Sequence, residues 1–187
     1  MIKYIVDAGK FSKITGFRQV SVDNKEEFLR SVRKTQMDLT IQFFDADFVC
    51  TWEHLFFAAL NSLAAFRNGT NISKRQDMEM LLYASAQRQI SKAITLIGIK
   101  ADSANIALVA VDSSRRLVEE SISGISSMLR THPDDSILEL NQEKAIRIKE
   151  MFQITEQEIA SVMKENCKNQ ALVDLVIERM ALLPTQI

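Results

Sequence analysis

The sequence has few of the residues that build disulfide frameworks, metal sites or rigid linkers. Its 187 residues include two cysteines, two histidines and two prolines. Cys50 and Cys167 lie far apart and fit no redox or metal-ligand spacing. His54 and His132 cannot form a local metal-binding cluster. We therefore predict a protein that uses no metal and no cofactor.

Long apolar runs and an excess of one charge are also missing. No stretch approaches the length needed to cross a bilayer, and the amino terminus lacks the pattern of a signal peptide. We therefore expect an intracellular protein, cytoplasmic or, in a eukaryote, also nuclear. The net charge of -1 argues against coating nucleic acid by bulk charge, so any RNA contact must use a local basic surface.

The hydrophobic pattern is typical of an α+β, or mixed α/β, protein. Residues 1–187 contain no Pro- or Gly-rich linker and are predicted to form a single domain, with several helices packed on a small, mostly antiparallel or mixed sheet. The predicted strands are Ile2–Val6, Phe17–Val22, Leu39–Phe43 and Ile106–Val111, the last being central. The predicted helices are Lys25–Lys34, Trp52–Arg67, Lys74–Ile97, Leu117–Leu129, Asn141–Phe152 and Asn169–Leu183.

Capping residues mark several of these helix ends. Thr155 with Glu158, and Ser73 with Gln76, have the spacing of a capping box. Gly69 stands where the carboxyl end of a helix favours a left-handed residue. The chain is therefore expected to turn after Gly69 and to begin its longest helix near Ser73.

No motif amounts to an active site. Gly9-Lys10 lacks the rest of a phosphate-binding loop. Cys50 lies four residues before His54, so that a cysteine–histidine pair is conceivable, and Asp45 with Asp47 could hold a cation. We favour a buried structural thiol and an ordinary turn. A small nucleotide-binding enzyme built on these residues is the less favoured alternative.

The predicted helix Lys74–Ile97 carries a basic stripe on one side and a lone carboxylate on the other. Lys74, Arg88 and Lys92 share the basic side, which could follow a phosphate backbone, although most such stripes are only solvated surface. Glu79 stands among core-type residues, where it needs a positive or hydrogen-bonding partner. It is either a structural residue or a contact to a partner subunit.

Two helices carry more apolar surface than one buried face requires. Trp52–Arg67 is apolar nearly all round, and Asn169–Leu183 leaves only a narrow charged strip. Either these helices are central to the core or part of their surface meets a partner. His54 shares a narrow side with small residues, and we favour a core histidine over one that faces a ligand.

Two regions carry a recognisable pattern. In the first, the residues concerned are His54, Ala65-Phe66, Asn71-Ile72, Glu79, Leu81, Leu82, Arg88-Gln89-Ile90, Ala93 and Gly98. In the second, they are FQITEQEI at 152–159 and LVIERMALL at 175–183. This pattern resembles the family of the PRPK-binding protein, the auxiliary subunit of the KEOPS complex.

The resemblance implies an accessory role without chemistry. KEOPS makes the threonylcarbamoyl modification on the adenosine next to the anticodon of tRNAs. Members of this family bind its kinase-like ATPase subunit, act indirectly with its threonylcarbamoyl transferase subunit, and contact tRNA, including the single-stranded 3′ end. The resemblance thus predicts a non-catalytic protein that binds a kinase and RNA.

Both predicted roles can be assigned to particular residues. The predicted RNA-binding residues are Lys74, Arg88 and Lys92, with Arg75 and His54 as outer candidates. The predicted kinase contacts are Leu175, Arg179 and Leu182. A protein-only scaffold or regulator of a kinase, without RNA binding, is the main alternative.

Overall fold

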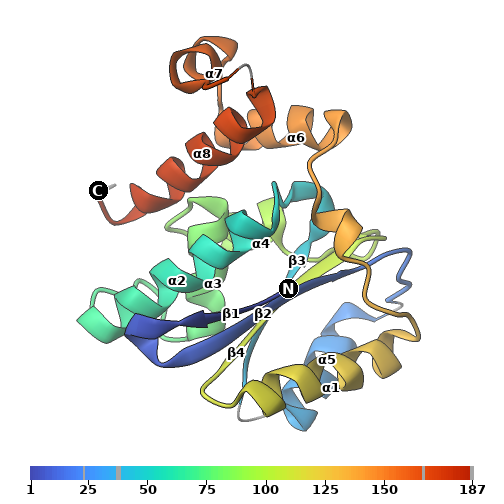
Figure 1. The fold of residues 1–187 in the computed structure, drawn as a ribbon. Coiled ribbons are helices and arrows are strands. Elements are labelled where there is room, and N and C mark those ends of the chain that lie inside the picture. The colour runs from blue at the N-terminus through green and yellow to red at the C-terminus, as the bar shows by residue number, and fades with distance from the viewer. Residues whose placement is uncertain (23, 37–38, 166, 186–187) are drawn as a thin grey trace.

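The centre of the molecule is an antiparallel sheet (Figure 1). The computed structural model describes residues 1–22, 24–36, 39–165 and 167–185. The strands are β1 (Ile2–Ile5), β2 (Lys10–Phe17), β3 (Thr40–Asp45) and β4 (Ile106–Asp112), in the order β1-β2-β4-β3. Residues 106–111 of β4 are fully buried because helices cover both faces of the sheet. The α+β fold class and the central strand are therefore confirmed.

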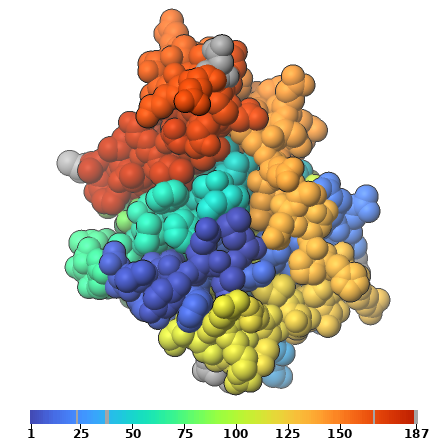
Figure 2. All heavy atoms as spheres, viewed as in Figure 1, coloured from blue at the N-terminus to red at the C-terminus, as the bar shows by residue number. Residues whose placement is uncertain are grey.

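The helices form a layer on each face of the sheet. One face is covered by α1 (Lys25–Thr35) and α5 (Arg115–Leu129). The other is covered by α2 (Trp52–Asn68) and α3 (Gln76–Ser85), with α4 (Ile90–Ile97) packed beside α3. Outside this layer α8 (Lys168–Ala181) packs on α2 and α3, and α6 (Gln142–Phe152) and α7 (Glu156–Val162) lie beside α8. Short 3-10 helices occupy Val6–Ala8, Ala46–Phe48, Asp135–Leu138 and Leu183–Thr185. Figure 2 shows the carboxyl-terminal helices, in orange and red, seated on α2.

The second strand differs from the sequence prediction. The strand expected over Phe17–Val22 is instead β2, which ends at Phe17. Gly9, with φ +62°, ends the turn after β1 and lets β2 pair with β1 as a hairpin. Ser12 and Thr15 are buried polar residues that interrupt the apolar pattern of β2. Periodicity therefore failed to reveal this strand.

The prediction of a single long helix over Lys74–Ile97 is wrong. The stretch Lys74–Ile97 forms two helices, α3 and α4, joined by the corner Ala86–Gln89, which we call the α3–α4 corner. Ala86 has φ +49°, and the N–H of the next residue, Gln87, donates to the Leu82 carbonyl 3.0 Å away. The chain therefore turns at a left-handed alanine, and no continuous stripe runs along both helices.

Most predicted caps are confirmed. Thr155 and Glu158 form a reciprocal capping box at α7, and Gly69 ends α2 with φ +67°. The box predicted for Ser73 and Gln76 is wrong: α3 begins only at Gln76, and the Ser73 hydroxyl instead accepts the Arg75 N–H at 3.2 Å. The backbone N–H of Ser73 itself is bound by a side chain from within α3, that of Glu79.

Candidate RNA and kinase interface

The four predicted basic residues divide into two groups at opposite ends of α3. Lys74 and Arg75 are exposed just before the helix, and Arg75 forms a two-point ion pair with Asp77. Arg88 and Lys92 are exposed at the α3–α4 corner and on α4. Ten residues of helix separate the groups by about 15 Å. The structure thus replaces the predicted stripe with two basic clusters.

Arg88 is the cation that faces the carboxyl-terminal segment. Its guanidinium lies 3.5 Å from the Leu183 carbonyl oxygen, just beyond the end of α8. Neither Arg88 nor Lys92 forms an ion pair within the described part of the chain. Both charges therefore remain open to an anionic partner.

Glu79 has a structural role. Its side chain is fully buried, and its two carboxylate oxygens accept the backbone N–H groups of Ile72 at 3.1 Å and Ser73 at 2.6 Å. These bonds fix the segment that connects α2 to α3, directly ahead of Lys74 and Arg75. The Glu79 carboxylate, for which the sequence shows no partner, is thus stabilised by backbone N–H groups of the segment between α2 and α3, through charge-assisted hydrogen bonds.

His54 is a core histidine whose ring offers no exposed surface to RNA. Its side chain is 0% exposed. Nδ1 accepts the Cys50 N–H at 3.1 Å and Nε2 lies 2.7 Å from the Ala84 carbonyl oxygen, a pattern that assigns the proton to Nε2. Burial lowers the pKa of His54 to about 4, so the ring is neutral near pH 7. The preferred interpretation of this residue, a core histidine, is confirmed, and its burial does not support its place among the outer RNA candidates.

The residues of the enzyme alternative are all engaged in structural contacts. Burial raises the pKa of the Cys50 thiol to about 12, and the bond to His54 comes from the Cys50 backbone. Asp45 accepts the Ser103 hydroxyl at 2.6 Å, and Asp47 pairs with Arg147. The structure describes no cluster of three or more potential metal-ligating side chains in the parts of the chain that it places.

The three predicted kinase contacts differ in exposure. Leu175 is only 3% exposed and belongs to the core, which does not support its place on a contact surface. Arg179 is half-buried and paired with Glu158 of α7. Leu182 is 43% exposed and precedes Leu183, whose carbonyl oxygen faces Arg88. One RNA candidate and one kinase candidate therefore lie at the same corner of the molecule.

Among the described residues, the buried polar side chains of His54 and Glu79 are hydrogen-bonded within the protein. At the surface, the α3–α4 corner carries the exposed cation Arg88. A family model described as "Kinase binding protein CGI-121" matches residues 17–184. The chain belongs to the CGI-121 kinase-binding protein family. The resemblance drawn from 54–98 and the carboxyl end is thereby confirmed, and the match extends well beyond those residues.

A curated relative supports the same assignment. The Regulatory protein Cgi121 of Methanocaldococcus jannaschii is 32% identical over 139 residues, which cover 74% of this chain and 86% of that protein. A CGI-121 protein is a kinase-binding protein without catalysis of its own, as the sequence predicted. None of the helices in the described ranges is both long and apolar enough to cross a bilayer.

Proposed function

We propose that this CGI-121 protein is an accessory subunit of the KEOPS complex that binds the kinase-like ATPase and presents tRNA, including its 3′ end. The kinase-binding part follows from the family. The RNA part is supported by one observation above all: Arg88 and Lys92 are exposed on neighbouring elements, with no ion pair in the described structure. Such cations can meet phosphates, and an arginine can also stack on an unpaired base.

Charge reversal at the α3–α4 corner tests the RNA role. The double variant Arg88→Glu, Lys92→Glu should bind an unmodified tRNA at least about tenfold more weakly than the native protein. It should also show a shallower dependence of affinity on salt, because about one fewer counterion is released for each phosphate that the variant no longer binds. Affinity is measured at two salt concentrations, with and without the 3′ CCA end.

A matched control comes from the opposite face of the sheet. Arg115 and Arg116 on α5 are exposed and pair with Glu119 and Glu120 one turn away. The variant Arg115→Glu, Arg116→Glu changes the net charge by the same amount and should leave tRNA affinity nearly unchanged. Equal losses in both double variants would indicate bulk charge and not a site at the corner. Thermal unfolding checks that each variant is folded.

The kinase contact is proposed at the same corner. Leu182 and Ile90 are large apolar side chains that are about 40% exposed or slightly more. Exposed apolar residues beside an open arginine are typical of the core of a protein interface. Because α8 contributes Val176 and Met180 to the core, point substitutions at the corner are a cleaner test than removal of α8. Kinase binding by a native protein that has no measurable tRNA affinity would favour the scaffold alternative.

A further inference from the structure

A groove with a volume of about 620 Å³ runs along the outer edge of β3. We call it the β3 groove. Its walls come from opposite faces of the sheet: Leu29 and Arg33 of α1 on one side, Met78 of α3 and Ile94 of α4 on the other. Ile41 of β3 is part of its floor. The volume is within the range of about 300–1,000 Å³ that is typical of ligand sites.

The register of the sheet shows which backbone groups face this groove. Ala46 donates its N–H to the Asn105 carbonyl at 2.9 Å, directly beyond the pair formed by Asp45 and Ile106. Antiparallel strands alternate between residues that bond to the neighbour and residues that point away from it. Gln42 and Phe44 therefore bond to β4.

The same alternation leaves two residues of β3 with outward-facing backbone. The N–H and C=O groups of Ile41 and Phe43 point away from β4, toward the groove. In the described structure the Phe43 carbonyl accepts only the side-chain amide of Gln42, at 2.8 Å, and the two N–H groups have no acceptor. An edge of this kind is a template for one more strand, which proteins usually block.

The rim of the groove is basic. Lys25 and Arg33 of α1 and Arg75 before α3 line it, and Asp77 is the one acidic residue among its described lining. Because Asp77 is paired with Arg75, the charges of Lys25 and Arg33 are uncompensated within the lining. The rim thus favours an acidic ligand, and the walls between its cations are apolar.

We propose that the β3 groove binds an extended acidic segment of a protein partner, which adds a fifth strand to the sheet beside β3. The backbone of the segment would pair with Ile41 and Phe43, and the Gln42 amide would give up the Phe43 carbonyl. Apolar side chains of the segment would pack on Leu29 and Met78, and its carboxylates would meet Lys25 and Arg33. This is recognition by β-strand addition, with charge selecting the sequence.

The alternation of donors and acceptors favours a peptide over a nucleic acid. Ile41 and Phe43 present N–H and C=O groups in turn, and a peptide backbone matches both at the spacing of a strand. A phosphate backbone offers acceptors for the two N–H groups but no regular donors for the carbonyls. The β3 groove is also separate from the corner residues Arg88 and Lys92, which do not line it.

The test uses the whole chain and a blocked peptide of alternating valine and glutamate, matched to the six residues of β3. In the free protein the amides of Ile41 and Phe43 should exchange quickly with solvent, whereas those of Gln42 and Phe44 should be protected. Adding the peptide should protect Ile41 and Phe43 and shift their NMR resonances. Replacing glutamate with lysine in the peptide should weaken binding at least about tenfold.

Two changes separate strand addition from simple charge attraction. A peptide methylated on the backbone nitrogens that face β3 keeps its charge but loses its donors, and it should bind at least about tenfold more weakly. In the protein, Ile41→Pro removes one outward N–H while leaving the bonds to β4, because proline is tolerated on an edge strand. It should abolish binding, and Ile41→Ala, which keeps the N–H, should retain most of it.

If Ile41→Pro does not fold, the variant Lys25→Glu, Arg33→Glu still tests the proposal. It should reverse the charge preference of the groove, so that the valine–lysine peptide binds better than the valine–glutamate peptide. Equal binding of the native and methylated peptides would overturn the proposal. So would resonance shifts confined to residues outside the groove, or displacement of the peptide by a single-stranded RNA ending in CCA, which would assign the groove to nucleic acid.

Discussion

The Nε2 nitrogen of His54 lies 2.7 Å from the carbonyl oxygen of Ala84, inside a fully buried contact between α2 and the end of α3. This bond reaches α3 two residues before Ala86, where the chain leaves the helix. Phe152 of α6 packs edge-on against the imidazole, with ring centroids 5.6 Å apart. A residue that sequence reasoning considered for RNA binding therefore supports the corner that carries Arg88, without reaching the surface.

The burial of His54 predicts a loss of stability in mild acid. Its pKa is about 4 in the folded protein and near 6.5 in an unfolded chain. Between these values the unfolded chain binds a proton that the folded chain does not, so the free energy of unfolding falls as the pH falls. The full effect is about 3 kcal/mol, present above pH 6.5 and lost as the pH approaches 4.

The measurement is urea unfolding of the native protein and of His54→Gln across that pH range. The variant should be less stable near pH 7, because it cannot satisfy both the Cys50 N–H and the Ala84 carbonyl in the same geometry. It should also lose most of the pH dependence. His132→Gln, at an exposed position, is the control and should behave like the native protein. Parallel pH curves for all three proteins would contradict the assignment.

We expect substitution of Glu79 to lower the stability of the protein strongly, although Glu79 itself makes no direct contact to RNA. Glu79→Ala leaves the N–H groups of Ile72, which is partly buried, and Ser73, which is buried, without their acceptor, at a cost of about 2–4 kcal/mol in the free energy of unfolding. Glu79→Gln keeps one acceptor oxygen and should lose less. Amide exchange at Ile72 and Ser73 should speed up in both variants, most in the alanine variant.

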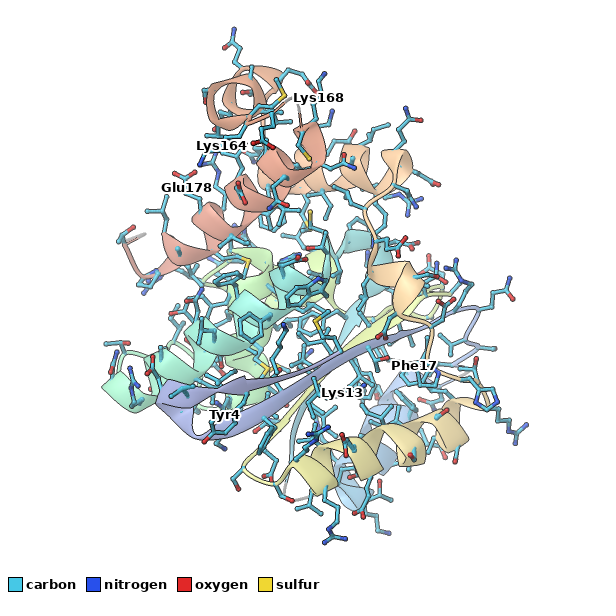
Figure 3. All side chains as sticks on the ribbon, viewed as in Figure 1. Tyr4, Lys13, Phe17, Lys164, Lys168 and Glu178 are labelled. Carbon is cyan, nitrogen blue, oxygen red and sulfur yellow. The ribbon has the colours of Figure 1, made fainter. Side chains whose placement is uncertain are left out.

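The control for Glu79 is a carboxylate on the surface. Glu178 lies on the outer side of α8 (Figure 3). Glu178→Ala should change stability by no more than about 0.5 kcal/mol. If Glu79→Ala were as mild as Glu178→Ala, the loop amides would have to find other partners, and the role given to Glu79 would be wrong.

We expect substitutions at Leu175 and Leu182 to differ in their effects on stability and on kinase binding, although the two residues lie only about two helical turns apart at the carboxyl end. Leu175→Ala opens a cavity in the core and should cost about 2–4 kcal/mol of stability. Leu182→Ala removes exposed surface and should cost less than about 0.5 kcal/mol. In a binding assay with the kinase-like ATPase, Leu182→Glu should weaken the complex while the protein stays folded. Native affinity in that variant would place the kinase contact elsewhere.

The parts of the fold that the sequence predicted are those set by local chemistry. The cap at Thr155 was predictable because a side-chain oxygen bonds to an N–H three residues later. The central strand β4 was predictable because burial on both faces requires a continuous apolar run. β2 was missed because Ser12 and Thr15 are buried there, and only the tertiary packing makes those positions interior.

The candidate sites were less predictable because they depend on contacts between distant segments. Arg88 faces Leu183, which is 95 residues away in sequence. The β3 groove joins α1, β3, α3 and α4, so no window of sequence contains it. Lys25 and Arg33 line the groove together only because α1 lies beside the sheet edge. Leu175 and Leu182 could not be separated by periodicity, since both belong to the broad apolar surface of the predicted helix Asn169–Leu183.

The most direct test of the fold concerns Ala86. In a continuous helix from Lys74 to Ile97, Ala86→Gly would destabilise the protein by about 1 kcal/mol, because glycine is a poor residue inside a helix. In the structure Ala86 has φ +49°, a region that costs a residue with a Cβ about 1–2 kcal/mol and costs glycine almost nothing. Ala86→Gly should therefore stabilise the protein, by up to about 1 kcal/mol after the loss of one buried methyl group.

Ala84→Gly provides the matched control, because Ala84 is a buried alanine within the bounds of α3, two residues before Ala86. It should cost about 1 kcal/mol or more in the free energy of unfolding. Opposite signs for the two glycine variants, measured by urea unfolding, are the expected result of a helix that ends at Ser85. Two losses of similar size would mean that the helix continues through Ala86, and Arg88 and Lys92 would then lie with Lys74 on the single stripe that periodicity predicted.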